Sequence, residues 1–344
     1  MNRKLGRITR STLLLLLGTI IGLFLAYNRT TRSYLSKYLS SSVKKVEDSR
    51  HSKWDKNFKV VEIESTMDAK IQKAFFYRSR SSEPKPLIIS LHTWSAYYTQ
   101  NDPLAKLSKQ NDINYIHPNF RGENITVEAC NSTLALSDID DAIDYAKTNA
   151  NVDDSEIHIV GFSGGGYATI GAFMKSRHRI KTFSAWASIT DLIQWFDESK
   201  VRGLKYANDI LFCTDSKNGN LNMQIARSRS PIYWETPSQK LNYSQLNLYA
   251  GINDGLQGSV PITQSINFYN KVLKDLGETD SLNYVSDHET LKLLTLRKPI
   301  ADLGSMADRS ICLRKKSNNI TLTIFDGGHE ILPEYAFNEL VPED

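Results

Sequence analysis

The sequence predicts an α/β fold, in which helices cover both faces of a mostly parallel sheet. Of the 344 residues, 40% are hydrophobic and 23% are charged, proportions that match a globular protein and exclude a disordered or collagen-like chain. Short apolar runs alternate with helical patterns through most of the chain, as they do where parallel strands are joined by helices. No internal repeat interrupts this alternation.

The N-terminus precedes that domain and predicts a membrane anchor. Residues 11–28 carry no charge, follow four basic residues and would span about 27 Å as a helix, close to the thickness of a bilayer's hydrocarbon core. The run ends in FLAYNR, which lacks the small residues of a cleavage site. We expect residues 1–28 to be an uncleaved signal anchor, with a cleaved signal peptide as the alternative.

The next segment, residues 29–55, is polar and basic and predicts a stalk, which leaves residues 56–344 as the globular domain. Residues 1–50 carry ten Lys and Arg against two Asp and Glu, whereas residues 51–344 carry 32 against 36. Because the positive charge belongs to the arm, no nucleic-acid partner is expected. We expect the globular domain outside the cytoplasm, in the periplasm or at the cell surface, or secreted if the N-terminus is cleaved.

Within the globular domain, elements are predicted in order. Segments 58–63 and 71–77 alternate between apolar and polar residues, which predicts an antiparallel hairpin. The apolar positions 139, 142, 143 and 146 have the spacing of an amphipathic helix, and helices are also predicted over 168–174 and 265–276. The sequence predicts six further strands, over 87–91, 114–117, 157–160, 182–187, 246–250 and 320–325. Residues 189–244 and 280–315 do not fit the alternation, and we expect them to be insertions that shape a ligand pocket.

The motif G-x-S-x-G lies at residues 161–165, between a predicted strand and a predicted helix. In that context the serine occupies a sharp turn, and the flanking glycines let the strand and the helix approach each other. The helix N-terminus favours an oxyanion beside Ser163. The alternative is a glycine-rich turn that contains an incidental serine. The strand and the helix favour Ser163 as a nucleophile.

A serine nucleophile needs a histidine base, and the base needs a carboxylate to orient it. Where the serine lies in a G-x-S-x-G turn, the acid and then the histidine follow it in the chain. Only His288 and His329 lie beyond residue 200. His329 follows the last predicted strand and is the expected base, whereas His288 lies at the polar start of a helix. Asp254, just after a strand, is the expected acid, and Asp191 is the alternative.

The oxyanion hole requires two donors. We expect the backbone N–H groups of Gly164 and of Trp94, which lies in the loop after the strand at 87–91; Thr93 is the second choice. His92 in the same loop is expected to be a structural hydrogen-bonding residue.

Two residues are predicted to contact substrate. Arg121, at the carboxyl end of a strand, would hold a carboxylate or a sugar oxygen; the alternative is that it pairs with Asp138 or Glu128 and braces its loop. Trp186 would stack on a sugar ring, or else belong to the core.

No cofactor or metal is expected, because the sequence lacks HExxH, a P-loop and GxGxxG after the first strand. Three cysteines without a CxxC pair do not suggest a zinc site. An extracytoplasmic domain could pair two of them, for instance Cys130 with Cys213, which would leave one thiol.

Six short segments carry a resemblance to a known family: HTWS (92–95), NFRG (119–122), DIDDA (138–142), GFSGGG (161–166), GINDG (251–255) and GGHE (327–330). Together they resemble the prolyl-oligopeptidase-like branch of the α/β-hydrolases, over about residues 57–340. The resemblance implies an α/β-hydrolase fold and a serine peptidase or sugar esterase. Oligopeptidases of this family carry a β-propeller before the hydrolase domain, and the short segment between the apolar run and the first strand has no room for one.

The sequence therefore predicts a membrane-anchored serine hydrolase that acts through an acyl-enzyme on carboxylic esters, for example an acylated carbohydrate. One alternative is a serine peptidase that acts on short peptides. Another is a non-catalytic α/β-hydrolase fold that binds a glycan or a protein. The presence of a full serine, acid and histidine set argues against a purely binding role.

Overall fold

A computed structural model describes residues 54–299 and 301–342. The chain divides into two compact units between Trp54 and Asp55, and the fold below is that of the second unit. The predicted anchor (1–28) and nearly all of the predicted stalk (29–55) lie outside the described residues. Within the described ranges, none of the helices has the length and apolar character needed to cross a bilayer.

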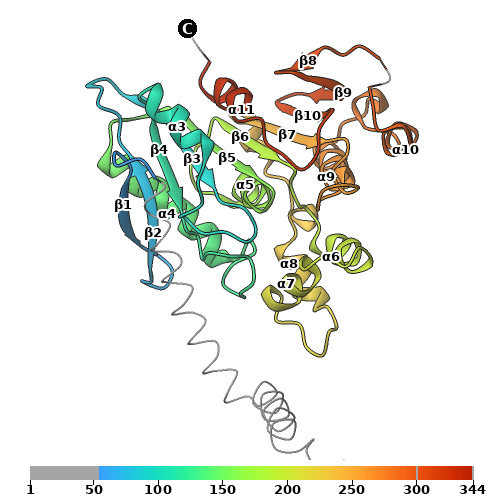
Figure 1. The fold of residues 1–344 in the computed structure, drawn as a ribbon, viewed down its shortest axis with the longest axis horizontal. Coiled ribbons are helices and arrows are strands. Elements are labelled where there is room, and N and C mark those ends of the chain that lie inside the picture. The colour runs from blue at the N-terminus through green and yellow to red at the C-terminus, as the bar shows by residue number, and fades with distance from the viewer. Residues whose placement is uncertain (1–53, 300, 343–344) are drawn as a thin grey trace, which may run out of the picture. The chain divides into compact units, whose positions relative to one another are not determined.

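One sheet of ten strands organises the domain, in the order β1-β2-β4-β3-β5-β6-β7-β10-β9-β8 (Figure 1). The pairs among β3, β4, β5, β6, β7 and β10 are parallel, and the strands toward both edges pair antiparallel. The α/β fold with a mostly parallel sheet is therefore confirmed. The strands are β1 (Lys59–Glu64), β2 (Ile71–Tyr77), β3 (Lys85–Leu91), β4 (Asn114–Pro118), β5 (Val152–Phe162), β6 (Thr182–Trp186), β7 (Gln245–Gly251), β8 (Ser305–Met306), β9 (Arg309–Ser317) and β10 (Ile320–Phe325).

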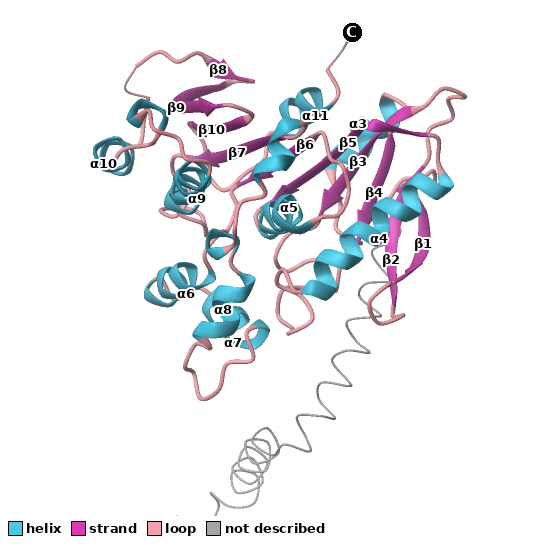
Figure 2. Ribbon diagram, turned by 180° about the vertical axis from the view of Figure 1, so that it is seen from behind, coloured by secondary structure: helices cyan, strands magenta, loops and turns pink. Residues whose placement is uncertain are grey.

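Helices cover both faces of the sheet. Figure 2 shows α4 and α5 in front of the strands, and Figure 1 shows α3 and α11 on the opposite face. The predicted amphipathic stripe of α4 is completely buried against the sheet, with Ile139, Ala142, Ile143 and Ala146 each 0% exposed. The helices are α3 (Pro103–Gln110), α4 (Thr133–Asn149), α5 (Gly164–Lys175), α6 (Leu192–Val201), α7 (Tyr206–Cys213), α8 (Met223–Arg229), α9 (Ile262–Asp275), α10 (Asp287–Leu296) and α11 (Pro333–Leu340).

The segment between β6 and β7 forms a helical insertion built from α6, α7 and α8. It has its own apolar cluster, whose central side chains include Trp195, Ile210 and Cys213, and Trp94 from the loop after β3 joins that cluster. Cys130 and Cys213 form a disulfide that ties α7 to the loop before α4, while Cys312 is a buried thiol. The suggested cysteine pairing is thus confirmed, and the insertion is fixed to the sheet domain by a covalent link.

The segment between α9 and β10 contains α10 and the edge strands β8 and β9, which the sequence pattern did not predict as strands. Strand β9 reads RSICLRKKS and has only three consecutive buried apolar residues, Ile311, Cys312 and Leu313, so it lacks the apolar run that marks the central strands. Helix α10 begins at a capping box in which Ser286 and Glu289 each accept a hydrogen bond from the other residue's backbone N–H. His288 lies in this exposed first turn, as its polar surroundings predicted.

Candidate active site

Ser163 lies in a strained turn between β5 and α5. Its φ of 58° and ψ of −118° fall in a region that non-glycine residues rarely adopt. A Cβ placed at Gly161 would lie 2.2 Å from the carbonyl oxygen of Gly165, and one at Gly165 would lie 2.1 Å from that of Leu91. Both positions of the motif therefore require glycine because backbone passes directly against them.

The structure brings His329 to both Ser163 and Asp254. The imidazole Nε2 lies 2.9 Å from Ser163 Oγ, and Nδ1 lies 2.7 Å from Asp254 Oδ2. The Asp254 side chain is fully buried, and its other oxygen accepts the backbone N–H groups of Gly255 and Val260. An imidazole held by a carboxylate on one nitrogen can accept a hydroxyl proton on the other.

The expected oxyanion donors lie next to each other. A Cβ at Gly164 would fall 2.2 Å from the backbone nitrogen of Trp94. Gly164 is the first residue of α5, so its N–H has no partner within the helix. The N–H of Thr93, the second choice, instead donates to Gln100 Oε1 at 2.8 Å. The backbone N–H groups of Trp94 and Gly164 therefore remain the candidate pair of oxyanion donors.

His92 lies beneath this loop as a buried hydrogen-bonding residue. Its Nδ1 and Nε2 lie 2.9 Å from the carbonyl oxygens of Thr93 and Asn119, and its ring stacks on Phe120 with centroids 4.0 Å apart. Burial lowers the pKa of His92 to about 4, and the two carbonyl contacts only partly oppose that shift. A neutral imidazole that supports the loop fits the structural role expected for it.

Arg121 does not have the substrate-binding role predicted for it. Its guanidinium bridges Asp138, at 2.7 Å, and Asp68, at 2.9 Å, and also donates to Ser65. The side chain is 6% exposed, and Glu128 lies 3.5 Å away. The bracing alternative is correct, because Asp68 and Ser65 approach from the β1–β2 turn and complete a set of acceptors around the cation.

Trp186 is a core residue and offers no stacking face to a sugar. It is 0% exposed, stacks on Tyr249 with centroids 4.2 Å apart, and donates its indole N–H to Ser184. Its backbone carbonyl accepts the N–H of Ser163 at 2.8 Å. The residue therefore supports the nucleophile turn through its main chain.

Asp191, the alternative acid, is the N-cap of α6. One carboxylate oxygen accepts the N–H groups of Ile193 and Gln194, and the other accepts the hydroxyl of Tyr233 at 2.8 Å. The Asp191 carboxylate is therefore engaged by residues of the helical insertion. The carboxylate that contacts His329 is that of Asp254.

Two residues near the site, Ser259 and Arg202, were not predicted from the sequence. Ser259 Oγ lies 3.3 Å from His329 Nε2, so a second hydroxyl reaches the same nitrogen. Arg202, just after α6, donates to the carbonyl oxygens of Gly255, Gly258 and Ser259. The only signal in the sequence was the position of Ser259 five residues after Asp254; nothing in the sequence links Arg202 to that loop.

The described residues contain no cluster of three or more His, Cys, Asp or Glu side chains arranged to bind a metal. The groups brought together beside Ser163 are His329, Asp254 and the backbone N–H groups of Gly164 and Trp94.

Comparison with known proteins identifies one family. Residues 104–289 match the model of the prolyl oligopeptidase family. No curated protein matches the sequence.

Solved structures share the fold at low sequence identity. An acylaminoacyl peptidase in complex with Z-Gly-Gly-Phe-chloromethyl ketone superposes with a TM-score of 0.56 at 18% identity, over 83% of this chain and 40% of that chain. The Pyrococcus horikoshii acylaminoacyl peptidase gives 0.55 at 16% identity over the same shares. Oligopeptidase B from Leishmania major gives 0.54 at 13%, over 83% of this chain and 36% of its own. The chain thus spans about two fifths of the length of these structures.

Proposed function

The chain belongs to the prolyl oligopeptidase family, and from this premise we propose that it is a serine hydrolase of the peptidase type. The observation that carries the proposal is the position of His329 Nε2, 2.9 Å from the hydroxyl of Ser163, at a turn with strained backbone. Family membership favours peptide bonds, because the solved structures of the same fold include an acylaminoacyl peptidase and oligopeptidase B.

The reaction proceeds through an acyl-enzyme. Ser163 Oγ attacks the substrate carbonyl carbon while its proton passes to His329 Nε2, and Asp254 stabilises the resulting imidazolium. The N–H groups of Gly164 and Trp94 donate to the oxyanion. His329 then protonates the leaving amine as the C–N bond breaks. A water molecule, deprotonated by His329, attacks the ester and releases the acid and the Ser163 hydroxyl.

A fluorophosphonate probe tests this proposal, because it labels only an activated serine. We expect the wild-type chain to be labelled and Ser163→Ala to remain unlabelled while folding normally by circular dichroism. Ser259→Ala is the matched control, since it removes the other hydroxyl near His329 and should leave labelling in place. A folded wild type that does not react would contradict the proposal.

Ester hydrolysis is a second candidate, and a small cavity favours it. A space of about 60 Å³ is lined by Thr93, Phe162 and Ile331 among others. In the chain, Thr93 directly precedes Trp94, Phe162 directly precedes Ser163, and Ile331 follows His329 by two residues. A space this small would admit only a short acyl group, such as an acetyl group. Because Trp186 is fully buried, it cannot bind a sugar as the alcohol portion of such an ester.

Activity on p-nitrophenyl acetate, p-nitrophenyl octanoate and aminoacyl p-nitroanilides separates the two candidates. A peptidase should show a higher kcat/KM on one of the nitroanilides than on either ester after correction for spontaneous hydrolysis. Preference for the acetate over both other classes would favour the esterase.

We also propose that the domain is membrane-anchored and lies outside the cytoplasm. The apolar run at residues 11–28 supports the anchor, and the Cys130–Cys213 disulfide supports an oxidising compartment. The chain should sediment with membranes, and a version that starts at residue 56 should not. If cells are lysed in a thiol-blocking reagent and the purified protein is then denatured, thiol titration should detect one reactive group, that of the buried Cys312. Recovery of three reactive thiols would contradict the location.

A further inference from the structure

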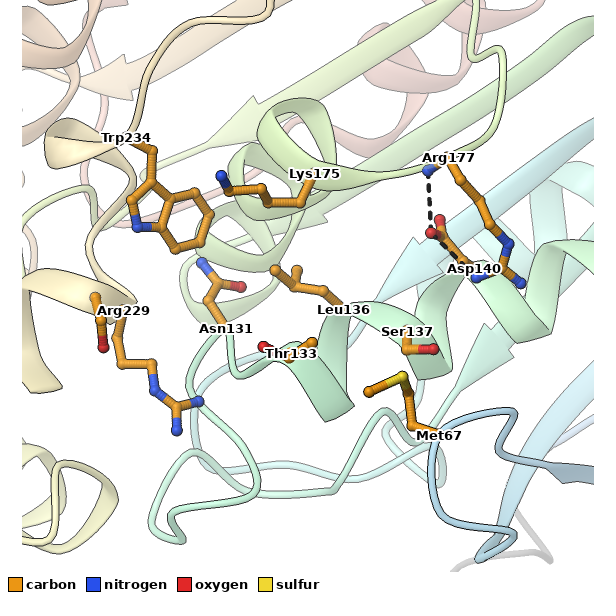
Figure 3. Close-up of a pocket in the computed structure, with 11 residues that line it drawn as sticks. Met67, Asn131, Thr133, Leu136, Ser137, Asp140, Lys175, Arg177, Arg229 and Trp234 are labelled. Atoms are coloured by element: carbon orange, nitrogen blue, oxygen red, sulfur yellow. Dashed lines mark hydrogen bonds and ion pairs between the residues drawn. The ribbon is translucent and has the colours of Figure 1, made fainter.

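A cavity of about 750 Å³ lies at the end of α5 that is remote from Ser163 (Figure 3). Its walls come from the first turns of α4, the last residues of α5, the end of α8 and the segment around Trp234. Ser163 precedes α5, and Lys175 ends it; a helix of 12 residues is about 18 Å long. The cavity is therefore separate from the candidate active site.

The cavity carries an excess of positive charge. Lys175, Arg177 and Arg229 line it together with a single carboxylate, that of Asp140. Arg177 is neutralised at one end of the cavity, because its guanidinium lies 3.4 Å from Asp140 and 3.0 Å from Asp141. Figure 3 shows that pair set apart from Lys175 and Arg229.

Lys175 and Arg229 lack such compensation. Within the part of the chain that the structure describes, neither cation lies within ion-pair distance of a carboxylate. The Arg229 guanidinium donates to the carbonyl oxygens of Val127 and Ala129, at 2.9 and 3.1 Å. Lys175 Nζ lies 5.2 Å from the ring centroid of Trp234. Desolvation lowers the pKa of Arg229, as expected for a half-buried cation without an anionic partner.

The remaining walls suit an organic anion. Thr133, which lines the cavity, is the first residue of the 17-residue helix α4, so the positive end of that helix dipole lies at the cavity wall. Leu136 and Met67 add apolar surface. Tyr167 connects two of the walls, because its hydroxyl, with one proton to donate, lies 2.6 Å from the carbonyl oxygen of Arg229 and 3.0 Å from that of Cys130.

From this arrangement we propose that the cavity binds a small organic anion, in which a phosphate or carboxylate group lies between Lys175 and Arg229 and an apolar or aromatic part packs near Trp234. The two cations attract the anionic group, and the volume accommodates a molecule considerably larger than an inorganic ion. The proposal does not depend on the hydrolase activity.

Isothermal titration with three probes tests the proposal: phenyl phosphate, inorganic phosphate and phenol. We expect saturable binding of phenyl phosphate, weaker binding of inorganic phosphate and none of phenol, with the affinity falling as NaCl is added. Protein pre-labelled at Ser163 with the fluorophosphonate should give the same isotherm, since the cavity is distant from the active site.

Variants locate the site. Lys175→Gln should weaken phenyl phosphate binding roughly fivefold, the effect of losing about 1 kcal/mol, and Lys175→Glu should weaken it further. Lys175 is exposed, so both variants should fold. Lys200→Gln is the matched control: Lys200 Nζ also lies over an aromatic ring, that of Phe196, at 5.6 Å, but outside the cavity. Absence of saturable binding, or equal affinities in all three variants and the wild type, would overturn the proposal.

Discussion

The indole N–H of Trp94 donates a hydrogen bond to Oδ2 of Asp209, at 3.2 Å, and this contact joins the loop of a proposed oxyanion donor to helix α7 of the insertion. The Trp94 ring also packs edge-on against Trp195, with centroids 4.8 Å apart. The insertion therefore provides the packing that fixes the position of the Trp94 backbone.

Replacing Trp94 by Phe should impair both stability and acylation. The change removes the donor to Asp209 and part of a buried ring, so we expect a loss of about 1–3 kcal/mol in the free energy of unfolding. Because the oxyanion loop loses its anchor, the rate of fluorophosphonate labelling should fall by about tenfold. Urea denaturation and labelling kinetics measure the two effects.

The control for that variant is Trp186→Phe. Its indole is equally buried and donates to Ser184 Oγ at 3.0 Å, but only its backbone contacts the nucleophile turn. It should lose similar stability and retain its labelling rate. If both variants label equally slowly, Trp94 has no particular role in the oxyanion hole.

Asp254→Asn distinguishes the two candidate acids. An amide in place of Asp254 would present an N–H group or a neutral oxygen to His329 Nδ1, so the tautomer needed for catalysis is lost and turnover should fall by about 10⁴. Asp191→Asn should instead leave turnover intact, and should lower stability by at most about 1 kcal/mol, since asparagine also caps helices well. A large loss of turnover in Asp191→Asn would reverse the assignment.

Much of this site could be predicted from the sequence, since a strand, a G-x-S-x-G turn and a helix are local features. His329 was also predictable, because it follows the last apolar strand by a short turn. The order of the residues along the chain and their places at strand ends were enough to indicate which loops come together. The burial of α4 followed for the same reason, because helical periodicity is read directly from neighbouring residues.

The direction of the side chains was not predictable. Arg121 and Trp186 both lie at strand ends, as expected, yet each points to a partner remote in sequence: Asp68 in one case and Tyr249 in the other. Arg202 is remote in the chain from the carbonyls that it binds. Such contacts depend on how an irregular insertion packs, and no local pattern encodes that packing.

The stability of the protein should fall as the pH drops from about 6.5 to about 4, in part because of His92. Burial lowers the pKa of His92 to about 4 in the folded chain, whereas an unfolded histidine titrates near 6.5. Between these values the unfolded state binds the proton and the folded state does not, so protonation favours unfolding. Above pH 6.5 this contribution to stability is fully present.

His92→Gln tests that pH dependence. Glutamine retains an N–H donor for the Asn119 carbonyl but cannot take up a proton, so the slope of the unfolding free energy against pH should become shallower between pH 4 and 6.5. The measurement is a series of urea denaturation curves across that range. An unchanged slope would mean that His92 does not contribute to the pH dependence.

Arg202 should act as a positioning residue for the proposed acid. Its guanidinium binds three carbonyl oxygens of the loop that follows Asp254, and the indole N–H of Trp195 binds one of them, that of Ser259, at 2.9 Å. Arg202→Met leaves these carbonyls with fewer donors, so the loop should become more mobile and the Asp254–His329 contact less well aligned. We expect kcat to fall by about tenfold with little change in KM, because alignment of reacting groups affects the transition state more than substrate binding. Arg202→Lys should recover part of kcat, since one ammonium can bind some of the carbonyls but cannot reproduce the planar fork. If Arg202→Met lowers only the urea midpoint, and kcat is the same in all three proteins, the residue stabilises the fold without positioning Asp254.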